Sequence, residues 1–334
     1  MTTEKDVHRT DRTIPLFAGE DIPHPDPTSP FADSGTNVHL EQMKDMLLTY
    51  NEYNPDLGYV QGMSDLLAPI YAVMQDDAVA FWGFVGFMER MVCALSVLSF
   101  GFIYIYADGN QERNFLRDQS GMREQLICLD QLVQLMDPRL YLHLQSADST
   151  NFFYFFRMFL VWYKREFQWT DVLRLWESLW TDYLSSNFHI FVAMAILEKH
   201  RDVIMNHLLH FDEVLKYSKF GSHYWDVNQL LTWGNKVNEL SNTIDLIPIL
   251  TRAESIFHRF ERTVNRIDKN SNLPAPPVHR QEPADTNGKG KSAQRDDSVP
   301  SALQRTSDHE TVVSPELRQL LRKDIYWVAH DNED

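Results

Sequence analysis

Apolar residues recur every three or four positions through most of this chain, and this spacing predicts helices. The first clear helix begins at Asn37, a residue type that caps helix N-termini, and ends before Asn54-Pro55. No alternating strand pattern and no repeat of fixed length interrupts the series. The pattern therefore predicts an all-α fold, with helices over 37–53, 64–75, 79–91, 122–136, 152–167, 171–183, 188–198, 201–217, 225–242 and 245–264, and a short one after Ser314-Pro315.

Two stretches lack this helical spacing. Residues 11–36 are rich in proline, which prevents helix formation and most strand pairing, so we expect a long irregular loop. Residues 266–312 are polar, contain Pro and Gly, and have few large apolar groups to offset the entropy of ordering. We therefore expect a helical domain over 1–265, a disordered linker over 266–312, and a short helix and tail over 313–334.

The net charge restricts the classes of partner. With 31 basic and 47 acidic residues the formal charge is −16, which disfavours nucleic-acid binding and adhesion to anionic membranes by charge alone. The two cysteines, Cys93 and Cys128, form no CxxC pair, as expected for a reduced compartment without disulfides. The N-terminus is charged from its fourth residue, so it does not read as a signal peptide. We expect a cytoplasmic protein.

Other chemical sites are not indicated. His200, His207 and His210 could share part of a helix face, but they lack supporting carboxylates or thiolates, so we expect no metal site. The sequence contains no P-loop, no GxSxG motif and no glycine-rich dinucleotide turn. We therefore expect no cofactor and no nucleotide bound by this chain itself.

Two short motifs near the start of the chain carry the most information: Asp6-Val7-His8-Arg9-Thr10 and Gly58-Tyr59-Val60-Gln61-Gly62-Met63. Taken singly, an arginine in a charged run is usually solvated surface, and a glutamine beside glycine is usually ordinary turn chemistry. In this order, followed by these helices and by the blocks 173–177 and 187–189, they resemble a TBC domain, the GTPase-activating module for Rab-family small GTPases. The resemblance covers roughly residues 4–262. It is greatest to the branch associated with Rabs of late endosomes and vacuoles.

The resemblance implies a role for each motif residue. Arg9 would be an arginine finger and Gln61 a glutamine finger, both supplied in trans to the GTPase. Asp6 would tether the loop that carries Arg9, and Tyr59 would help to hold the loop that carries Gln61. Gly62 would let the backbone turn closely beside that amide.

The partner implied by the resemblance is a Rab GTPase in its GTP form, which itself binds the Mg²⁺ and the nucleotide. The chain would then act in the cytoplasm, peripherally on endosomal or vacuolar membranes through the Rab. One alternative is a catalytically impaired Rab-binding or scaffold protein, and another is an incomplete gene-model fragment. A third is an unrelated helical interaction domain.

Two departures from the family pattern bear on activity. TBC domains have several helices before the arginine motif, whereas only eight residues precede Arg9 here, so we expect a domain incomplete at its N-terminus with Arg9 on a frayed end. Residues 92–111 form an apolar insert that interrupts the pattern. It is slightly short for a membrane span, and we expect no integral span. We interpret the insert as a translated intron, because its ends can be encoded by splice-like codons.

Overall fold

The computed structural model describes residues 2–93, 115, 119–210, 213–214, 245–271 and 313–323. Within these ranges the regular elements are all helices, and the one β-type pairing is an isolated bridge between Ile22 and Thr36. The predicted all-α class is confirmed. The predicted helix over 225–242 and most of the predicted linker lie outside the described residues, as do residues 94–111 of the predicted insert.

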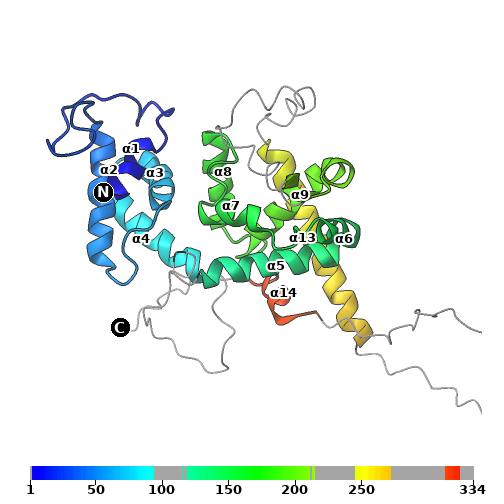
Figure 1. The fold of residues 1–334 in the computed structure, drawn as a ribbon. Coiled ribbons are helices and arrows are strands. Elements are labelled where there is room, and N and C mark those ends of the chain that lie inside the picture. The colour runs from blue at the N-terminus through cyan, green and yellow to red at the C-terminus, as the bar shows by residue number, and fades with distance from the viewer. Residues whose placement is uncertain are drawn as a thin grey trace, which may run out of the picture.

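Four helices form the N-terminal group (Figure 1): α1 (Thr2–Arg9), α2 (Val38–Tyr53), α3 (Met63–Met74) and α4 (Asp77–Cys93). The predicted helices in α2, α3 and α4 are confirmed. Asn37 caps α2 as expected, because its side chain accepts a hydrogen bond from the backbone N–H of His39 at 2.8 Å. Helix α1 was not predicted. The first two residues of the predicted insert, 92 and 93, belong to the end of α4.

The second group contains α5 (Ser120–Met136), α6 (Pro138–Ser146), the 3₁₀ turn η1 (Phe153–Phe155), α7 (Phe156–Leu160), α8 (Trp169–Trp180), α9 (Phe188–His207) and α13 (Leu246–Ser271). Helix α6 was not predicted, α8 ends three residues earlier than expected, and two further predictions are wrong. The single helix expected over 152–167 ends at Leu160, because Trp162 and Tyr163 take left-handed φ angles of +46° and +59°. The helices expected over 188–198 and from 201 onward are one continuous helix as far as His207.

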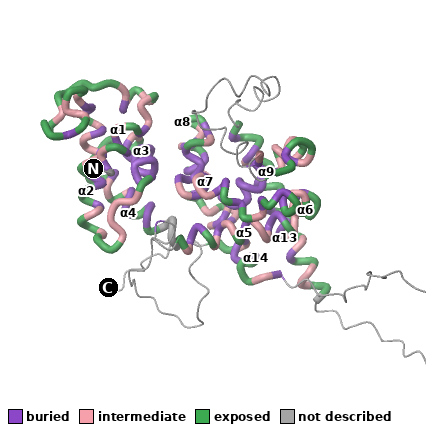
Figure 2. The backbone as a smooth tube through the Cα atoms, in the orientation of Figure 1, coloured by how far each residue is buried: buried purple, intermediate pink, exposed green. Residues whose placement is uncertain are grey.

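Aromatic side chains join the two groups. Phe87 of α4 lies 5.1 Å from the ring centroids of both Trp162 and Trp176, and 5.8 Å from that of Trp180. Figure 2 shows the buried residues on the faces that the helices turn toward one another. Burial of this aromatic surface is the main source of stability expected for such a helical domain.

The irregular segment over 11–36 is confirmed, and it is attached to the helices by buried side chains. Phe17 is fully buried and contacts the rings of Tyr71 and Trp169. The His24 imidazole is 3.2 Å from the Glu4 carboxylate of α1 and 3.9 Å from the Glu41 carboxylate of α2. These contacts hold the loop against both helices between which it runs.

The C-terminal part of the chain returns to the domain as α14 (Pro315–Gln319), capped by the Ser314 side chain. Arg318 pairs with Asp268 at 2.9 and 2.5 Å, and the Ser185 hydroxyl donates to the carbonyl of Leu320 at 2.7 Å. Leu320 is fully buried. Residues 266–271, assigned to the linker from sequence, are the last turns of α13.

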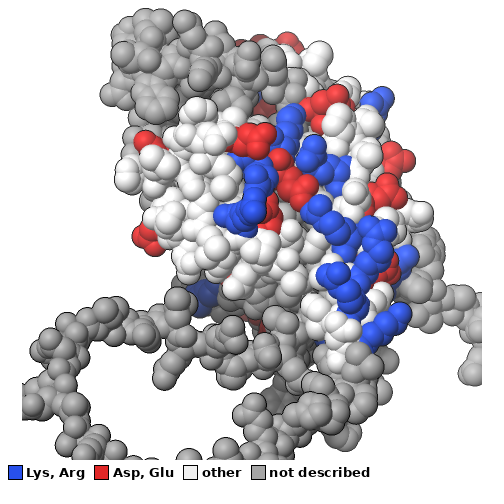
Figure 3. Space-filling model, turned by 90° about the vertical axis from the view of Figure 1, so that its right-hand side faces the viewer, with Lys and Arg blue, Asp and Glu red and all other residues white. Residues whose placement is uncertain are grey.

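Charge is not spread evenly over the surface despite the net value of −16. Figure 3 shows Lys and Arg side chains gathered in a band on one face. A groove between α5 and α13 is lined by three arginines together with apolar and hydroxyl groups: Arg259, Arg262, Arg266, Leu135, Met136 and Thr263. Among the helices of the described residues, none combines the length and apolar character needed to cross a bilayer.

Candidate functional site

Helix α1 positions the first motif. Asp6 and Arg9 are three residues apart and therefore share one face of the helix. The Asp6 side chain is buried, and its Oδ1 accepts a hydrogen bond from Arg9 Nη2 at 2.5 Å. The Arg9 side chain remains 58% exposed. The expectation of an arginine on a frayed end is not met, because Arg9 is the last residue of α1 and is tied to a buried carboxylate.

The second motif is a tight turn that leads into α3. Gly58 has φ = +68° and Gly62 has φ = +103°, and backbone in this region favours glycine. Between them, the backbone N–H of Tyr59 donates to Asn51 Oδ1 of α2 at 3.1 Å. Gln61 is exposed immediately before the N-cap of α3. The turn therefore presents the Gln61 amide from a backbone held at both ends.

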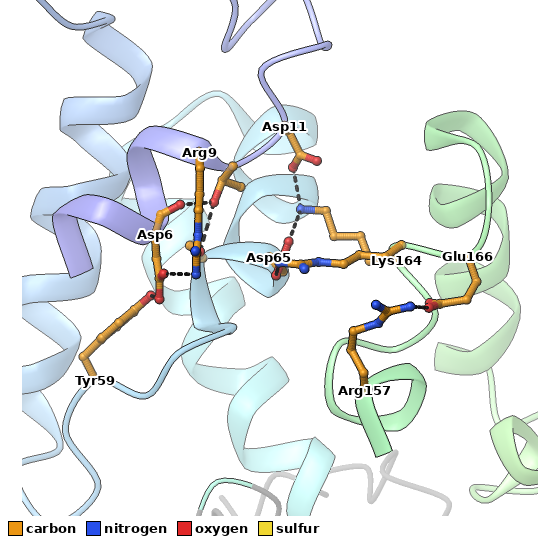
Figure 4. Close-up of polar contacts among 11 residues, drawn as sticks. Asp6, Arg9, Asp11, Tyr59, Asp65, Arg157, Lys164 and Glu166 are labelled. Carbon is orange, nitrogen blue, oxygen red and sulfur yellow. Dashed lines mark hydrogen bonds and ion pairs between the residues drawn. The ribbon is translucent and has the colours of Figure 1, made fainter. Parts of the chain in front are cut away.

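Asp6 joins the two motifs (Figure 4). While Oδ1 binds Arg9, Oδ2 accepts a hydrogen bond from the Tyr59 hydroxyl at 2.8 Å. Burial raises the pKa of Tyr59, and the Asp6 carboxylate raises it further, so the phenol stays protonated and donates. The predicted supporting roles of Asp6 and Tyr59 thus have a geometric basis: one carboxylate contacts both the arginine and the glutamine-bearing turn.

A second hydrogen bond links the same elements. The hydroxyl of Thr10, the residue after Arg9, bonds with the carbonyl oxygen of Asp6 at 2.6 Å and with Ser64 Oγ at 3.0 Å. Both side chains are buried. The end of α1 is therefore connected directly to the first turn of α3.

Sequence reasoning missed a cluster of ion pairs behind the two motifs. Lys164, which follows α7, contacts Asp11 and also Asp65 Oδ1, the latter at 3.4 Å. Arg165 binds the other oxygen of Asp65 at 2.6 Å (Figure 4). The signal available in the sequence is the charged triplet that begins at Lys164, directly after the aromatic-rich stretch of 152–163, in which Arg157 is the one charged residue.

The third member of that triplet is also paired. Glu166 is buried, and its Oε1 accepts a hydrogen bond from Arg157 Nη2 at 2.9 Å. Burial raises the pKa of Glu166, while Arg157 opposes the rise. This pair lies beside the Asp65 cluster in Figure 4 and fixes the segment between α7 and α8.

The arrangement suits chemistry on a molecule bound from outside. An exposed guanidinium can stabilise negative charge, and an exposed carboxamide can orient a water molecule. Across the described residues, no three histidine, cysteine, aspartate or glutamate side chains gather as metal ligands, and this includes His200, His207 and His210.

Comparison with known proteins identifies the family of the chain. The family model for the Rab-GTPase-TBC domain matches residues 3–205. GTPase-activating protein GYP7 of Yarrowia lipolytica is 53% identical over 274 residues, covering 80% of this chain and 32% of that protein. TBC1 domain family member 17 of Homo sapiens is 39% identical over 256 residues, covering 77% of this chain and 31% of that protein.

A solved structure supports the fold. The crystal structure of the Ypt/Rab-GAP domain of Gyp1p superimposes with a TM-score of 0.50 at 21% identity, covering 77% of this chain and 72% of that one. The chain spans about a third of the length of the curated relatives named above. With the family model matching well over half of its residues, the chain belongs to the Rab-GTPase-TBC domain family.

Proposed function

We propose that this chain accelerates GTP hydrolysis by a Rab-family GTPase, with Arg9 and Gln61 completing the GTPase site in trans. The observation that carries the proposal is the double contact of Asp6, which holds the exposed arginine and the glutamine-bearing turn together. Membership of the TBC family supports it, as do relatives whose names describe GTPase-activating proteins.

Arg9 would stabilise the transition state. Negative charge spreads over the γ-phosphate oxygens as water attacks, and a guanidinium neutralises that charge through two directed N–H groups. Such a finger contributes roughly 10³- to 10⁵-fold in rate, equivalent to about 4–7 kcal/mol of transition-state stabilisation. The ion pair with Asp6 orients the guanidinium before the GTPase binds, which limits the conformational entropy lost in the complex.

Gln61 would orient the attacking water. Its carboxamide can accept a hydrogen bond from the water and donate one to a neighbouring oxygen. Because Gly62 caps α3 in a left-handed conformation, the turn holds this side chain at the start of a buried helix. The Mg²⁺ and GTP would be bound by the partner, and this chain would contribute no cofactor.

The place of action follows from the partner. A GTP-loaded Rab is attached to a membrane, so this chain would act in the cytoplasm and reach the membrane through the Rab. The Rabs of late endosomes and vacuoles are the first to test, given the resemblance to the branch that serves them.

The test is single-turnover GTP hydrolysis by a panel of purified Rabs, with and without this protein. We expect acceleration of at least one Rab, and a loss of roughly 10³- to 10⁵-fold of that acceleration for Arg9→Ala. Gln61→Ala should also lower the hydrolysis rate while leaving Rab binding largely intact. Arg12→Ala is the control for Arg9, because Arg12 lies three residues further along the chain, beyond the end of α1, and pairs with Glu20. Gln134→Ala, at an exposed site on α5, is the control for Gln61.

Each other outcome has a definite meaning. Acceleration that survives both finger substitutions would contradict the two-finger mechanism. Rab binding without acceleration by the wild-type protein would indicate a Rab-binding scaffold instead. Absence of binding to every Rab, from a protein that melts cooperatively, would contradict the proposal as a whole.

A further inference from the structure

We propose that Lys164 is a positioning residue for both Arg9 and Gln61. The inference rests on the proposed function and adds to it a residue more than a hundred positions away in sequence from either finger. Lys164 itself does not face the site of reaction. It acts through Asp11 and Asp65, which follow the two finger motifs.

The contacts of the Lys164 amino group carry the inference. Nζ contacts Asp11 Oδ2 and lies 3.4 Å from Asp65 Oδ1. Asp11 is two residues after Arg9, and Asp65 is four residues after Gln61 in the first turn of α3. One cation therefore connects the backbone that leaves the arginine with the helix that follows the glutamine (Figure 4).

This connection complements the one made by Asp6. Asp6 joins the residues that precede the fingers, because it binds Tyr59 two positions before Gln61 and sits three positions before Arg9. Lys164 joins the residues that follow them. With a contact on each side, the separation of the two motifs is restrained both before and after the fingers, in addition to the Thr10–Ser64 hydrogen bond.

The cation is held firmly in place. Only 3% of the Lys164 side chain is exposed, and a buried charge is stable only with close partners of opposite sign. Arg165 occupies the second oxygen of Asp65 at 2.6 Å, which fixes the orientation of that carboxylate toward Lys164. Burial raises the pKa of Asp11, and the adjacent ammonium group opposes the rise.

The backbone before Lys164 is constrained to deliver it to this position. Trp162 and Tyr163 both have left-handed φ angles, a strained conformation for bulky residues that persists only when the surroundings impose it. The carbonyl of Trp162 accepts a hydrogen bond from the Trp176 indole at 2.9 Å. The hydroxyl of Tyr163 donates to the carbonyl of His189 at 2.6 Å. These two buried anchors set the direction in which the next residue projects.

The experiment measures kcat and KM for a responsive GTP-loaded Rab with Lys164→Met, which keeps the length of the side chain and removes its charge. We expect kcat to fall roughly 10- to 100-fold, as for a small misplacement of catalytic groups, with KM changed less than about threefold. Lys164→Arg should recover most of the rate. Asp11→Asn removes the ion pair with Lys164 and leaves the Lys164–Asp65 contact, so it should also lower kcat. This variant tests the inference if Lys164→Met folds poorly.

Two controls separate positioning from general stability. Arg201→Met removes an ion pair between elements remote from the fingers, that of Arg201 with Asp137 at 2.6 Å, and should leave kcat unchanged. Lys164→Met should also leave the affinity of the Arg9→Ala/Gln61→Ala protein for the GTP-loaded Rab unchanged, because a residue that acts only through the fingers has no other part in binding.

The possible failures are distinguishable. If the wild-type protein accelerates hydrolysis but Lys164→Met retains its kcat, the inference about Lys164 is wrong and the proposed function stands. A loss of Rab affinity caused by Lys164→Met in the protein without either finger would likewise overturn it, as a structural effect. If the wild-type protein accelerates no Rab, the proposed function itself fails.

Discussion

Asp6 illustrates how much one buried side chain contributes at the scale of single residues. Each oxygen of the Asp6 carboxylate has a different partner, Arg9 at 2.5 Å and Tyr59 at 2.8 Å. The position of the carboxylate is therefore set by both contacts together. Charge-assisted hydrogen bonds of this kind are about twice as strong as neutral ones. Because they are formed before any partner binds, the arginine is already oriented in the free protein.

His189 is buried, and its burial gives a prediction about pH. Its Nε2 donates to Gln125 Oε1 at 2.9 Å, and burial lowers the pKa of His189 to about 4. The unfolded chain, with a pKa near 6.5, binds the proton more readily. The contribution of His189 to stability is therefore complete above pH 6.5 and is lost as the pH falls toward 4, by about 3 kcal/mol.

Urea unfolding of the wild type and of His189→Gln between pH 7 and pH 4 measures this effect. The free energy of unfolding of the wild type should fall more steeply with decreasing pH, since glutamine keeps an N–H donor but does not titrate. His207→Gln, at an exposed position, should track the wild type. Parallel curves for all three proteins would contradict the assignment.

At the scale of secondary-structure elements, the start of α3 depends on a glycine. Gly62 has φ = +103°, outside the range that other residues adopt without strain. An added Cβ would meet Val161 Cγ1 at 3.6 Å, which is ordinary contact, so the obstacle is the backbone angle and not lack of space. The turn before α3 thus places Gln61 only as long as this position is glycine.

Gly62→Ala should lower the free energy of unfolding by about 1–3 kcal/mol and reduce stimulated GTP hydrolysis. The matched control is Gly86→Ala within α4, where an added Cβ meets nothing within 4 Å. Because alanine is the better helix former, this control should raise stability by up to about 1 kcal/mol. Equal effects of the two substitutions on thermal unfolding would show that the φ angle of Gly62 carries no cost.

At the scale of the whole molecule, segments far apart in the sequence pack against one another. The segment from Val313 to Lys323 packs on α5 and on the start of α9. On α5, the Ser314 hydroxyl donates to Gln131 Oε1 at 2.6 Å. At the start of α9, Asn187 Nδ2 donates to the carbonyl of Gln319 at 3.3 Å. The C-terminal residues thus belong to the same hydrophobic core as the helices of the second group.

Leu320→Ala should therefore destabilise the whole domain. Leu320 is 0% exposed, and truncation of a buried leucine costs about 2–5 kcal/mol. Leu142→Ala is the control, because that side chain on α6 is 63% exposed and its loss should change stability little. Calorimetry should show a single transition shifted to lower temperature for Leu320→Ala. A small separate transition with an unshifted main one would mean that the terminal segment docks independently.

The sequence by itself determined the helical class, the positions of α2 to α5, the cap at Asn37 and the two motifs by which the chain resembles its family. These depend on periodicity, capping chemistry and short motifs, all of which are local and can be read along the chain. Its errors were local as well: helices α1 and α6 were missed, and the left-handed residues Trp162 and Tyr163 end a predicted helix without any signal in the apolar pattern.

The tertiary structure alone decided which side chains meet. The Asp6–Tyr59 hydrogen bond spans 53 positions, and the Lys164–Asp11 pair spans 153. Such pairs form because the buried aromatic surfaces of the two helix groups pack together and bring distant charges into a shared interior. The spacing of residues along the chain does not predict which distant charges will meet. Arg9 and Gln61 could therefore be named from the sequence, but not all of the residues that hold them.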